Sequence, residues 1–204
     1  MIGSRQSDGA DEVGQASGHK LVAIIGPPNS GKSTLFNRLT GLRQKVANFP
    51  GVTVEHRVGK AHLAGHLEVD LVDLPGVYSM TPRSEDEQVS HDVLNGKMAG
   101  LERPDAVLLV LDSTNLNRHL LLAAPILTIG LPTLVLLNMA DDLGARGGKV
   151  NVELLAAQLG APVALVSATK GTGLDAVRRF LTGGIGLPRP VQLPVLQDLP
   201  ACRQ

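Results

Sequence analysis

A short segment near the start of the chain combines residue types that bind phosphate groups. It reads Gly26-Pro27-Pro28-Asn29-Ser30-Gly31-Lys32-Ser33, where two glycines enclose four residues and are followed by Lys and Ser. Glycines let backbone N–H groups wrap around phosphate oxygens, and a helix that begins behind them adds favourable partial charge. We expect Lys32 to neutralise the outer phosphates and the Ser33 hydroxyl to bind Mg²⁺. The remaining phosphate contacts are expected from Gly26, Asn29, Ser30, Gly31 and Thr34.

A second motif, Asp73-Leu74-Pro75-Gly76, follows another apolar segment. A carboxylate at Asp73 reaches Mg²⁺ directly or through water, and the Gly76 amide senses the terminal phosphate of a nucleoside triphosphate. Without the first motif, these four residues would predict only a turn. Thr53 lies between the two motifs, and we expect its hydroxyl to complete the metal shell when that phosphate is bound. A lone Thr that opens a strand is otherwise only a β-former.

The base is expected to be read by Asn138-Met139-Ala140-Asp141, which follows an apolar strand. Guanine offers a ring N–H and an exocyclic amine to a single acceptor, whereas adenine does not. The Asp141 carboxylate accepts both bonds, so the segment predicts GTP over ATP, by roughly 10⁴-fold in a site of this kind. A helix cap is the alternative reading. Ser167-Ala168-Thr169 follows the last strand, and its Ala168 amide is expected to donate to the guanine oxygen.

Composition excludes several other functions. The 204 residues carry 19 Lys and Arg against 19 Asp and Glu, and aromatic residues make up 2% of the chain. Such a chain lacks the basic excess of an electrostatic nucleic-acid binder and the rings on which single strands stack. The single cysteine, Cys202, excludes an internal disulfide framework. The uncharged stretch 120–140 is long enough for a membrane helix, but Pro125, Gly130 and Pro132 divide it into shorter elements.

Apolar strands alternate with amphipathic helices over most of the chain, which predicts an α/β fold with a mainly parallel six-stranded sheet and helices on both faces. The first motif therefore follows a strand and opens a helix, as a phosphate-binding loop does and an ordinary glycine-rich turn need not. Residues 44–51 are expected to form a loop. The expected strands are 21–25, 52–63, 66–74, 105–112, 132–137 and 162–167, and the expected helices are 34–42, 85–95, 116–129, 152–159 and 174–181.

With its motifs in this order, the chain resembles the Ras-like P-loop GTPases of the TRAFAC class. Within them it is similar to the N-terminal cytosolic G domain of the bacterial ferrous iron transport protein B (FeoB) family. The specific matches are residues 44–55 for that family's first switch, residues 73–81 for its second, and Met139 where other GTPases have Lys. The resemblance implies a G domain at 20–182. The polar composition of residues 1–19 predicts a flexible leader, and the prolines of residues 183–204 predict a linker or tail.

The resemblance also implies a GTPase that converts GTP and water to GDP and phosphate, with Mg²⁺ held by Ser33, Thr53 and Asp73. Lys32, Thr53, Gly76 and Asn29 are the residues expected to support hydrolysis. Val77 stands where many GTPases place a water-orienting Gln, and no arginine finger is identifiable. Another positive charge must then offset the charge of the transition state. In the resembling family it is K⁺, which implies ligands at Asn29 and at the carbonyls of Ala47 and Phe49.

The same resemblance implies a role in regulating Fe²⁺ uptake at the cytoplasmic side of the bacterial inner membrane. The implied partners are GTP and GDP, a membrane pore, a helical domain and a small cytosolic Feo accessory protein, with no nucleic acid. The chain itself carries no spanning segment and is expected to be soluble, either as a fragment or as a shortened relative.

Two other functions remain open from the residues alone. A ribosome-assembly or tRNA-modification GTPase shares the phosphate-binding motif, but it should carry a basic RNA-binding appendage. A module that signals by nucleotide occupancy, with little turnover, stays open because the water-orienting Gln is missing.

Overall fold

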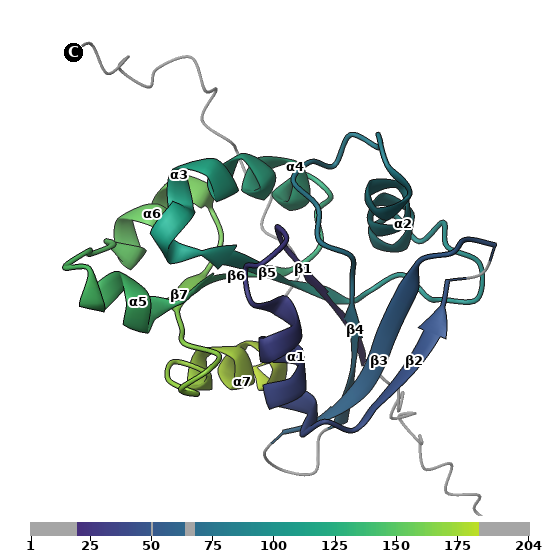
Figure 1. Ribbon diagram of the computed structural model, residues 1–204, viewed down its shortest axis with the longest axis horizontal. Helices are drawn as coiled ribbons and strands as arrows, with labels where there is room; N and C mark the ends of the chain where they lie inside the picture. The colour runs from purple at the N-terminus through teal and green to yellow at the C-terminus, as the bar shows by residue number, and fades with distance from the viewer. Residues whose placement is uncertain (1–19, 50, 64–67, 184–204) are drawn as a thin grey trace, which may run out of the picture.

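The computed structural model describes residues 20–49, 51–63 and 68–183, so the expected leader and nearly all of the expected tail lie outside the described residues. Seven strands form one sheet in the order β2-β3-β4-β1-β5-β6-β7 (Figure 1). The strands are β1 (Lys20–Ile25), β2 (Gln44–Asn48), β3 (Glu55–His62), β4 (Glu68–Asp73), β5 (Ala106–Asp112), β6 (Thr133–Asn138) and β7 (Val163–Leu165). The helices are α1 (Lys32–Thr40), α2 (Glu85–Leu94), α3 (Leu116–His119), α4 (Ala123–Leu127), α5 (Ala140–Ala145), α6 (Val152–Leu159) and α7 (Asp175–Thr182).

The strands on either side of β1 are parallel to it, so the motifs that follow their carboxyl ends lie at one edge of the sheet. β1 pairs with β4 and β5, β5 pairs with β6, and β6 pairs with β7, all in parallel. The register sets Ile24 beside Asp73 and Asp112 beside Asn138. Because ligands of open parallel sheets bind beyond the carboxyl ends of the strands, this edge is the expected place for a site.

Helices cover both faces of the sheet, with α1 and α7 on one face and α2, α3, α4 and α6 on the other (Figure 1). Side chains of β1 alternate between the two cores: Val22 and Ile24 pack with α1 and α7, while Ala23 and Ile25 pack on the opposite side. Both sets are fully buried, which explains why β1 is a continuous apolar run. The α/β class and the helices on both faces are therefore confirmed.

The expected loop at 44–51 is wrong, because its first part forms the edge strand β2, antiparallel to β3, and the sheet has seven strands rather than six. Its side chains from Lys45 to Asn48 are exposed, and Val46 is 56% exposed. A strand that buries no face shows no alternation of apolar residues, because backbone pairing alone holds it.

The expected single helix at 116–129 is also wrong. The chain forms two short helices there, α3 and α4, joined by a 3₁₀ turn at Leu120–Leu122. Pro125 has no N–H to donate to the carbonyl four residues earlier, and its ring crowds that carbonyl. Among the residues that the structure describes, no helix has both the length and the apolar composition needed to cross a bilayer.

The turn after β5 depends on a buried histidine. Asp112 donates its backbone N–H to Nδ1 of His119 at 3.0 Å, while its carboxylate accepts bonds from Thr114 and Asn115. His119 is only 6% exposed. Burial lowers the pKa of His119, although the Asp112 carboxylate opposes that shift. Nδ1 must be unprotonated to accept the bond, so the turn requires a neutral ring.

This bond predicts a pH-dependent stability. The pKa of His119 in the folded chain lies below its unfolded value of about 6.5, so the unfolded chain binds more protons below that pH. The stability that the neutral ring provides is therefore present above about pH 6.5 and is lost as the pH falls below it. We expect His119→Gln, whose amide oxygen accepts the same bond without titrating, to flatten the decline in unfolding free energy measured by urea denaturation between about pH 7 and pH 5.

His62→Gln serves as the matched control because His62 is an exposed histidine at the end of β3. We expect the unfolding free energy of His62→Gln to fall with decreasing pH at least as steeply as that of the unchanged chain. Equal slopes for His119→Gln and the unchanged chain would contradict the role of the buried ring.

Candidate functional site

The loop between β1 and α1, residues 26–33, is held in shape by its glycines. A Cβ on Gly26 would lie 2.0 Å from the Val110 carbonyl oxygen, and one on Gly31 would lie 2.2 Å from Asn138 Nδ2. Gly31 also has a φ of 88°. Asn29 has a φ of 60°, an uncommon conformation for a residue with a side chain. These residues fit the phosphate-binding loop that the sequence predicts, and we refer to 26–33 as the phosphate loop.

Lys32 lies across the phosphate loop. Its Nζ donates to the Pro27 carbonyl oxygen at 3.0 Å, and the residue is 8% exposed. Burial lowers the pKa of Lys32, and the Asp73 carboxylate partly offsets this effect. A poorly solvated ammonium group in a loop of backbone amides gains favourable free energy from an incoming anion.

Ser33 and Asp73, predicted as metal ligands, lie side by side. The Ser33 hydroxyl donates to Asp73 Oδ2 at 3.0 Å, while Oδ1 is buried and has no hydrogen-bond partner among the described residues. Burial raises the pKa of Asp73, and the Ser33 bond and the charges of Lys32 and Arg57 act against it. A buried carboxylate oxygen without a partner costs free energy, and oxygen donors of this kind are those that Mg²⁺ prefers. The pair therefore fits a hard divalent cation.

Thr53, the third predicted Mg²⁺ ligand, is held elsewhere. Its hydroxyl donates to Oε2 of Glu85, the first residue of α2, at 3.0 Å on the protein surface. The structure therefore pairs Thr53 with α2, whereas Ser33 and Asp73 pair with each other.

The segment after Asp73 packs directly on the phosphate loop. The Val77 amide donates to the Gly26 carbonyl oxygen at 3.2 Å, and a Cβ on Gly76 would lie 3.0 Å from backbone atoms of Pro28. The Val77 side chain is 1% exposed within the apolar core. Gly76 therefore lies against the phosphate loop, and the Val77 side chain offers no polar group that could orient water.

The three predicted K⁺ ligands do not form one cluster in this structure. Asn29 is exposed in the phosphate loop. Ala47 is paired with His56 on edge strand β2, and the carbonyl of Phe49, just beyond that strand, accepts from the Val52 amide. β2 lies three positions from β1 in the sheet, roughly 14 Å at the usual strand spacing. Holding K⁺ with this set would require residues 47–49 to leave their present place.

Asn138 connects the phosphate loop to the segment predicted to surround the base. Its Nδ2 donates to the Ser30 carbonyl oxygen at 2.9 Å, and its Oδ1 accepts from the Ala168 amide at 2.9 Å. The side chain is 4% exposed. Both ends of the amide are therefore satisfied by backbone groups far apart in sequence. The Ala168 amide, predicted to donate to the guanine oxygen, would have to change acceptor to do so.

Met139 and Asp141 form the start of α5, the helix that follows β6. Met139 has a φ of 64° at the N-cap, a left-handed conformation that costs about 1–2 kcal/mol for a residue with a side chain. Asp141 lies in the first helical turn, with Oδ2 3.6 Å from Lys170 Nζ. A hydrogen bond from the Ser167 side chain is the main cause that lowers the pKa of Asp141, with Lys170 contributing. Asp141 is therefore an ionised acceptor, as guanine recognition requires.

The segment Ser167-Ala168-Thr169 follows β7 and borders the predicted base site next to Asn138. The Ser167 and Thr169 hydroxyls lie 3.1 Å apart, and the carbonyls of Ala168 and Thr169 accept bonds from the guanidinium of Arg38 on α1. Sequence reasoning missed Arg38. Its partners are backbone carbonyls about 130 residues away, and no residue pattern marks such a contact.

Comparison with known proteins identifies close relatives. A family model described as ferrous iron transport protein B matches residues 20–181. The Fe(2+) transporter FeoB of Escherichia coli (strain K12) is 42% identical over 162 residues, which cover 77% of this chain and 20% of the transporter. The transporter of Salmonella typhimurium gives the same values. The chain thus spans about a fifth of the length of these curated relatives.

Solved structures give the same relationship. A GDP-bound mutant of the S. thermophilus FeoB G domain has 44% identity and a TM-score of 0.70, covering 78% of this chain and 58% of that one. The cytosolic domain of the T. maritima FeoB iron transporter in its GMPPNP form has 34% identity and a TM-score of 0.78, covering 84% and 67%. With a family model that matches most of its length, this chain belongs to the ferrous iron transport protein B family and carries that family's N-terminal G domain.

Proposed function

We propose that this chain binds GTP and GDP and hydrolyses GTP, as the switch domain of a ferrous iron transporter. Buried Asn138 is the observation that carries the proposal. It holds the phosphate loop at Ser30 and the base-side segment at Ala168 in one fixed relation. A nucleotide has to be held at both ends at once, and this arrangement provides both ends. Relatives solved in GDP and GMPPNP forms support the same ligand class.

Each predicted site residue has a separate role in the proposed hydrolysis. Lys32 leaves the Pro27 carbonyl to neutralise the outer phosphates, and the Gly76 amide donates to the terminal phosphate. Ser33 and Asp73 would hold Mg²⁺, with Thr53 joining them after it leaves Glu85. When bound, Mg²⁺ supplies positive charge to the phosphate oxygens.

A second candidate is a module that binds nucleotide and signals by occupancy with little turnover. Buried Val77 favours it, because its apolar side chain cannot orient the attacking water. Multiple-turnover phosphate release from GTP separates the two: steady release supports an enzyme, and a single turnover supports occupancy signalling.

The proposal for the whole protein rests on family membership. We propose that residues 20–182 form the G domain and that its nucleotide cycle regulates Fe²⁺ uptake through the attached helical domain and pore. In this proposal the domain lies at the cytoplasmic side of the bacterial inner membrane, where a small Feo accessory protein is a candidate partner. The test is Fe²⁺ uptake by cells whose whole transporter carries Asp141→Asn.

Asp141→Asn should change the choice of base. An amide cannot accept both guanine N–H groups, but it can pair with the N–H and the carbonyl that xanthine presents at the same edge. We expect GTP affinity to fall at least about a hundredfold, since two bonds to a charged acceptor are lost. Isothermal titration with GTP, XTP and ATP measures this. Asp142→Asn, the adjacent exposed acid, is the control and should leave GTP binding unchanged. Unchanged GTP affinity in Asp141→Asn would contradict the assignment of the base site.

Phosphate release should be faster in K⁺ than in Na⁺ at equal ionic strength, and Asn29→Ala should remove the difference. The physical reason is that no arginine finger is identifiable from the sequence, so another positive charge has to offset the charge of the transition state. Because 47–49 must move to hold K⁺, we expect the effect on turnover and not on GDP affinity. Equal rates in the two salts for the unchanged chain would exclude K⁺ activation.

Removing the Glu85 carboxylate should release Thr53. The surface bond between them contributes about 1 kcal/mol, so Glu85→Ala is expected to raise the rate of GTP hydrolysis by about fivefold at most. Asp86→Ala removes the neighbouring exposed acid from the same first turn of α2 and controls for the loss of charge at the helix start. Phosphate-release assays at low Mg²⁺ compare the two. An equal effect of both changes would show that charge, and not the Thr53 bond, is responsible.

A further inference from the structure

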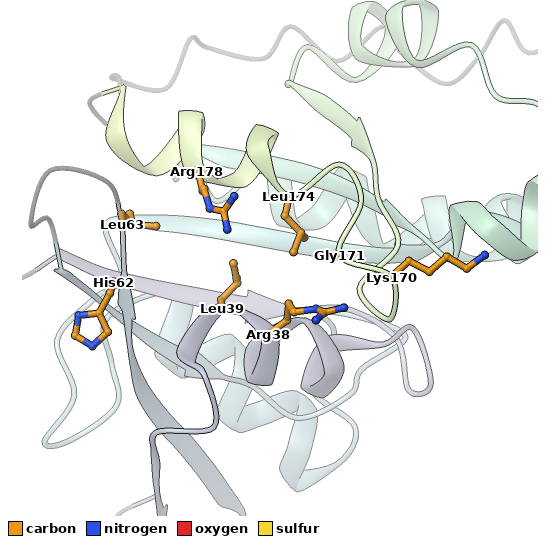
Figure 2. Close-up of a pocket in the computed structure, with 8 residues that line it drawn as sticks. All are labelled: Arg38, Leu39, His62, Leu63, Lys170, Gly171, Leu174 and Arg178. Atoms are coloured by element: carbon orange, nitrogen blue, oxygen red, sulfur yellow. The ribbon is translucent and has the colours of Figure 1, made fainter.

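Arg38 extends from α1 to the segment behind the predicted base site. Its Nε donates to the Ala168 carbonyl oxygen at 3.2 Å, and its Nη2 donates to the Thr169 carbonyl oxygen. Figure 2 shows the side chain reaching from α1 toward the loop that carries Lys170 and Gly171. The two bonds use the fixed fork of the guanidinium on two successive carbonyls.

The loop that receives Arg38 is tightly folded. Its Gly171 amide donates to the Ser167 carbonyl oxygen at 2.7 Å, and the Ser167 amide donates to the Thr172 carbonyl oxygen. Gly171 has a φ of 76°, and a Cβ there would lie 3.3 Å from Arg38 Nη2. The loop 167–172 is thus a closed turn whose inner side rests against the guanidinium.

Ala168 is held on both sides of the chain. Its amide donates to Asn138 Oδ1, and its carbonyl accepts from Arg38 Nε. Both partners are attached to the phosphate loop, since Asn138 bonds to the Ser30 carbonyl and Arg38 belongs to the helix that begins at Lys32. A movement of loop 167–172 away from the phosphate loop must break bonds to a charged donor, which are stronger than bonds between neutral groups.

We propose that Arg38 is a positioning residue that sets how long a guanine nucleotide stays bound. It fixes loop 167–172 against α1, and that loop must open before the base can leave. The inference rests on the proposed function, and it adds a determinant of nucleotide release that lies outside the nucleotide-binding motifs. Arg38 bonds to the carbonyls of Ala168 and Thr169 and is not itself a predicted nucleotide contact. Because it stabilises the closed loop, its effect belongs in the dissociation rate, where most changes in affinity appear.

The chain offers a matched control in Arg178 on α7. Arg38 and Arg178 line the same cavity of about 230 Å³ between α1 and α7, so replacing either removes one positive charge from the same place (Figure 2). Arg178 bonds to Asp175 on its own helix. Comparing Arg38→Gln with Arg178→Gln therefore separates the tie to loop 167–172 from the electrostatic effect on an anionic nucleotide.

The experiment is stopped-flow displacement of a fluorescent GDP from the unchanged chain, Arg38→Gln, Arg38→Lys and Arg178→Gln. We expect GDP to dissociate about tenfold faster from Arg38→Gln, with an association rate within about twofold of the original. Arg38→Lys can satisfy one carbonyl, so its GDP dissociation rate should lie between those of Arg38→Gln and the unchanged chain. The rate for Arg178→Gln should equal that of the unchanged chain. Hydrogen exchange of the Gly171 amide in nucleotide-free protein should rise in Arg38→Gln alone.

An unchanged dissociation rate in Arg38→Gln, or an equal increase in Arg178→Gln, would overturn the inference. If Arg38→Gln does not fold, Arg38→Lys tests the inference in its place. A GDP dissociation rate from Arg38→Lys equal to that of the unchanged chain would then overturn it. Failure of the unchanged chain to bind GDP would instead overturn the proposed function. The two failures are therefore distinguishable in one set of measurements.

Discussion

The site depends on one buried side chain, that of Asn138. A buried primary amide is costly unless its donor and acceptor are both satisfied, and here Ser30 and Ala168 satisfy them from segments 108 residues before it and 30 residues after it. The absence of a Cβ at Gly31 leaves the space that Nδ2 occupies. The phosphate loop, the end of β6 and loop 167–172 are thus fixed together, and changing any one of them disturbs the other two.

The parallel sheet makes this cross-link possible, because it delivers the phosphate loop, Asp73 and Asn138 to one edge. Among the described residues, two of the three non-glycine residues with positive φ, Asn29 and Met139, lie at this edge, and the third, Leu42, follows α1. Such conformations persist only where the surrounding structure fixes them. In this chain the register of β1, β4, β5 and β6 fixes the strand ends from which Asn29 and Met139 follow.

Most of the features that could be predicted from the sequence are patterns of neighbouring residues. The phosphate loop, the apolar strands β1, β5 and β6, and the corner at Asp141 are each contained in a few consecutive residues. Edge strand β2 was missed because it buries no face. The division of 116–129 was missed because the amphipathic pattern continues through Pro125, although that proline was already expected to divide the stretch 120–140. Contacts such as Arg38 with two carbonyls, or Thr53 with Glu85, join residues through tertiary structure, and their residue types alone do not identify the partner.

The two halves of the site differ in how well their polar groups are satisfied. On the phosphate side, Asp73 Oδ1 and the Ser30 hydroxyl are buried without partners among the described residues, and burial lowers the pKa of Lys32. On the base side, Asn138 and Ala168 are fully bonded, and Arg38 holds the loop. In the proposed complex, a phosphate group and a metal ion would relieve this unfavourable burial, whereas the base would meet a bonded frame in which the Ala168 amide has to change acceptor. Binding free energy should come chiefly from the phosphates, and selectivity and residence time from the frame.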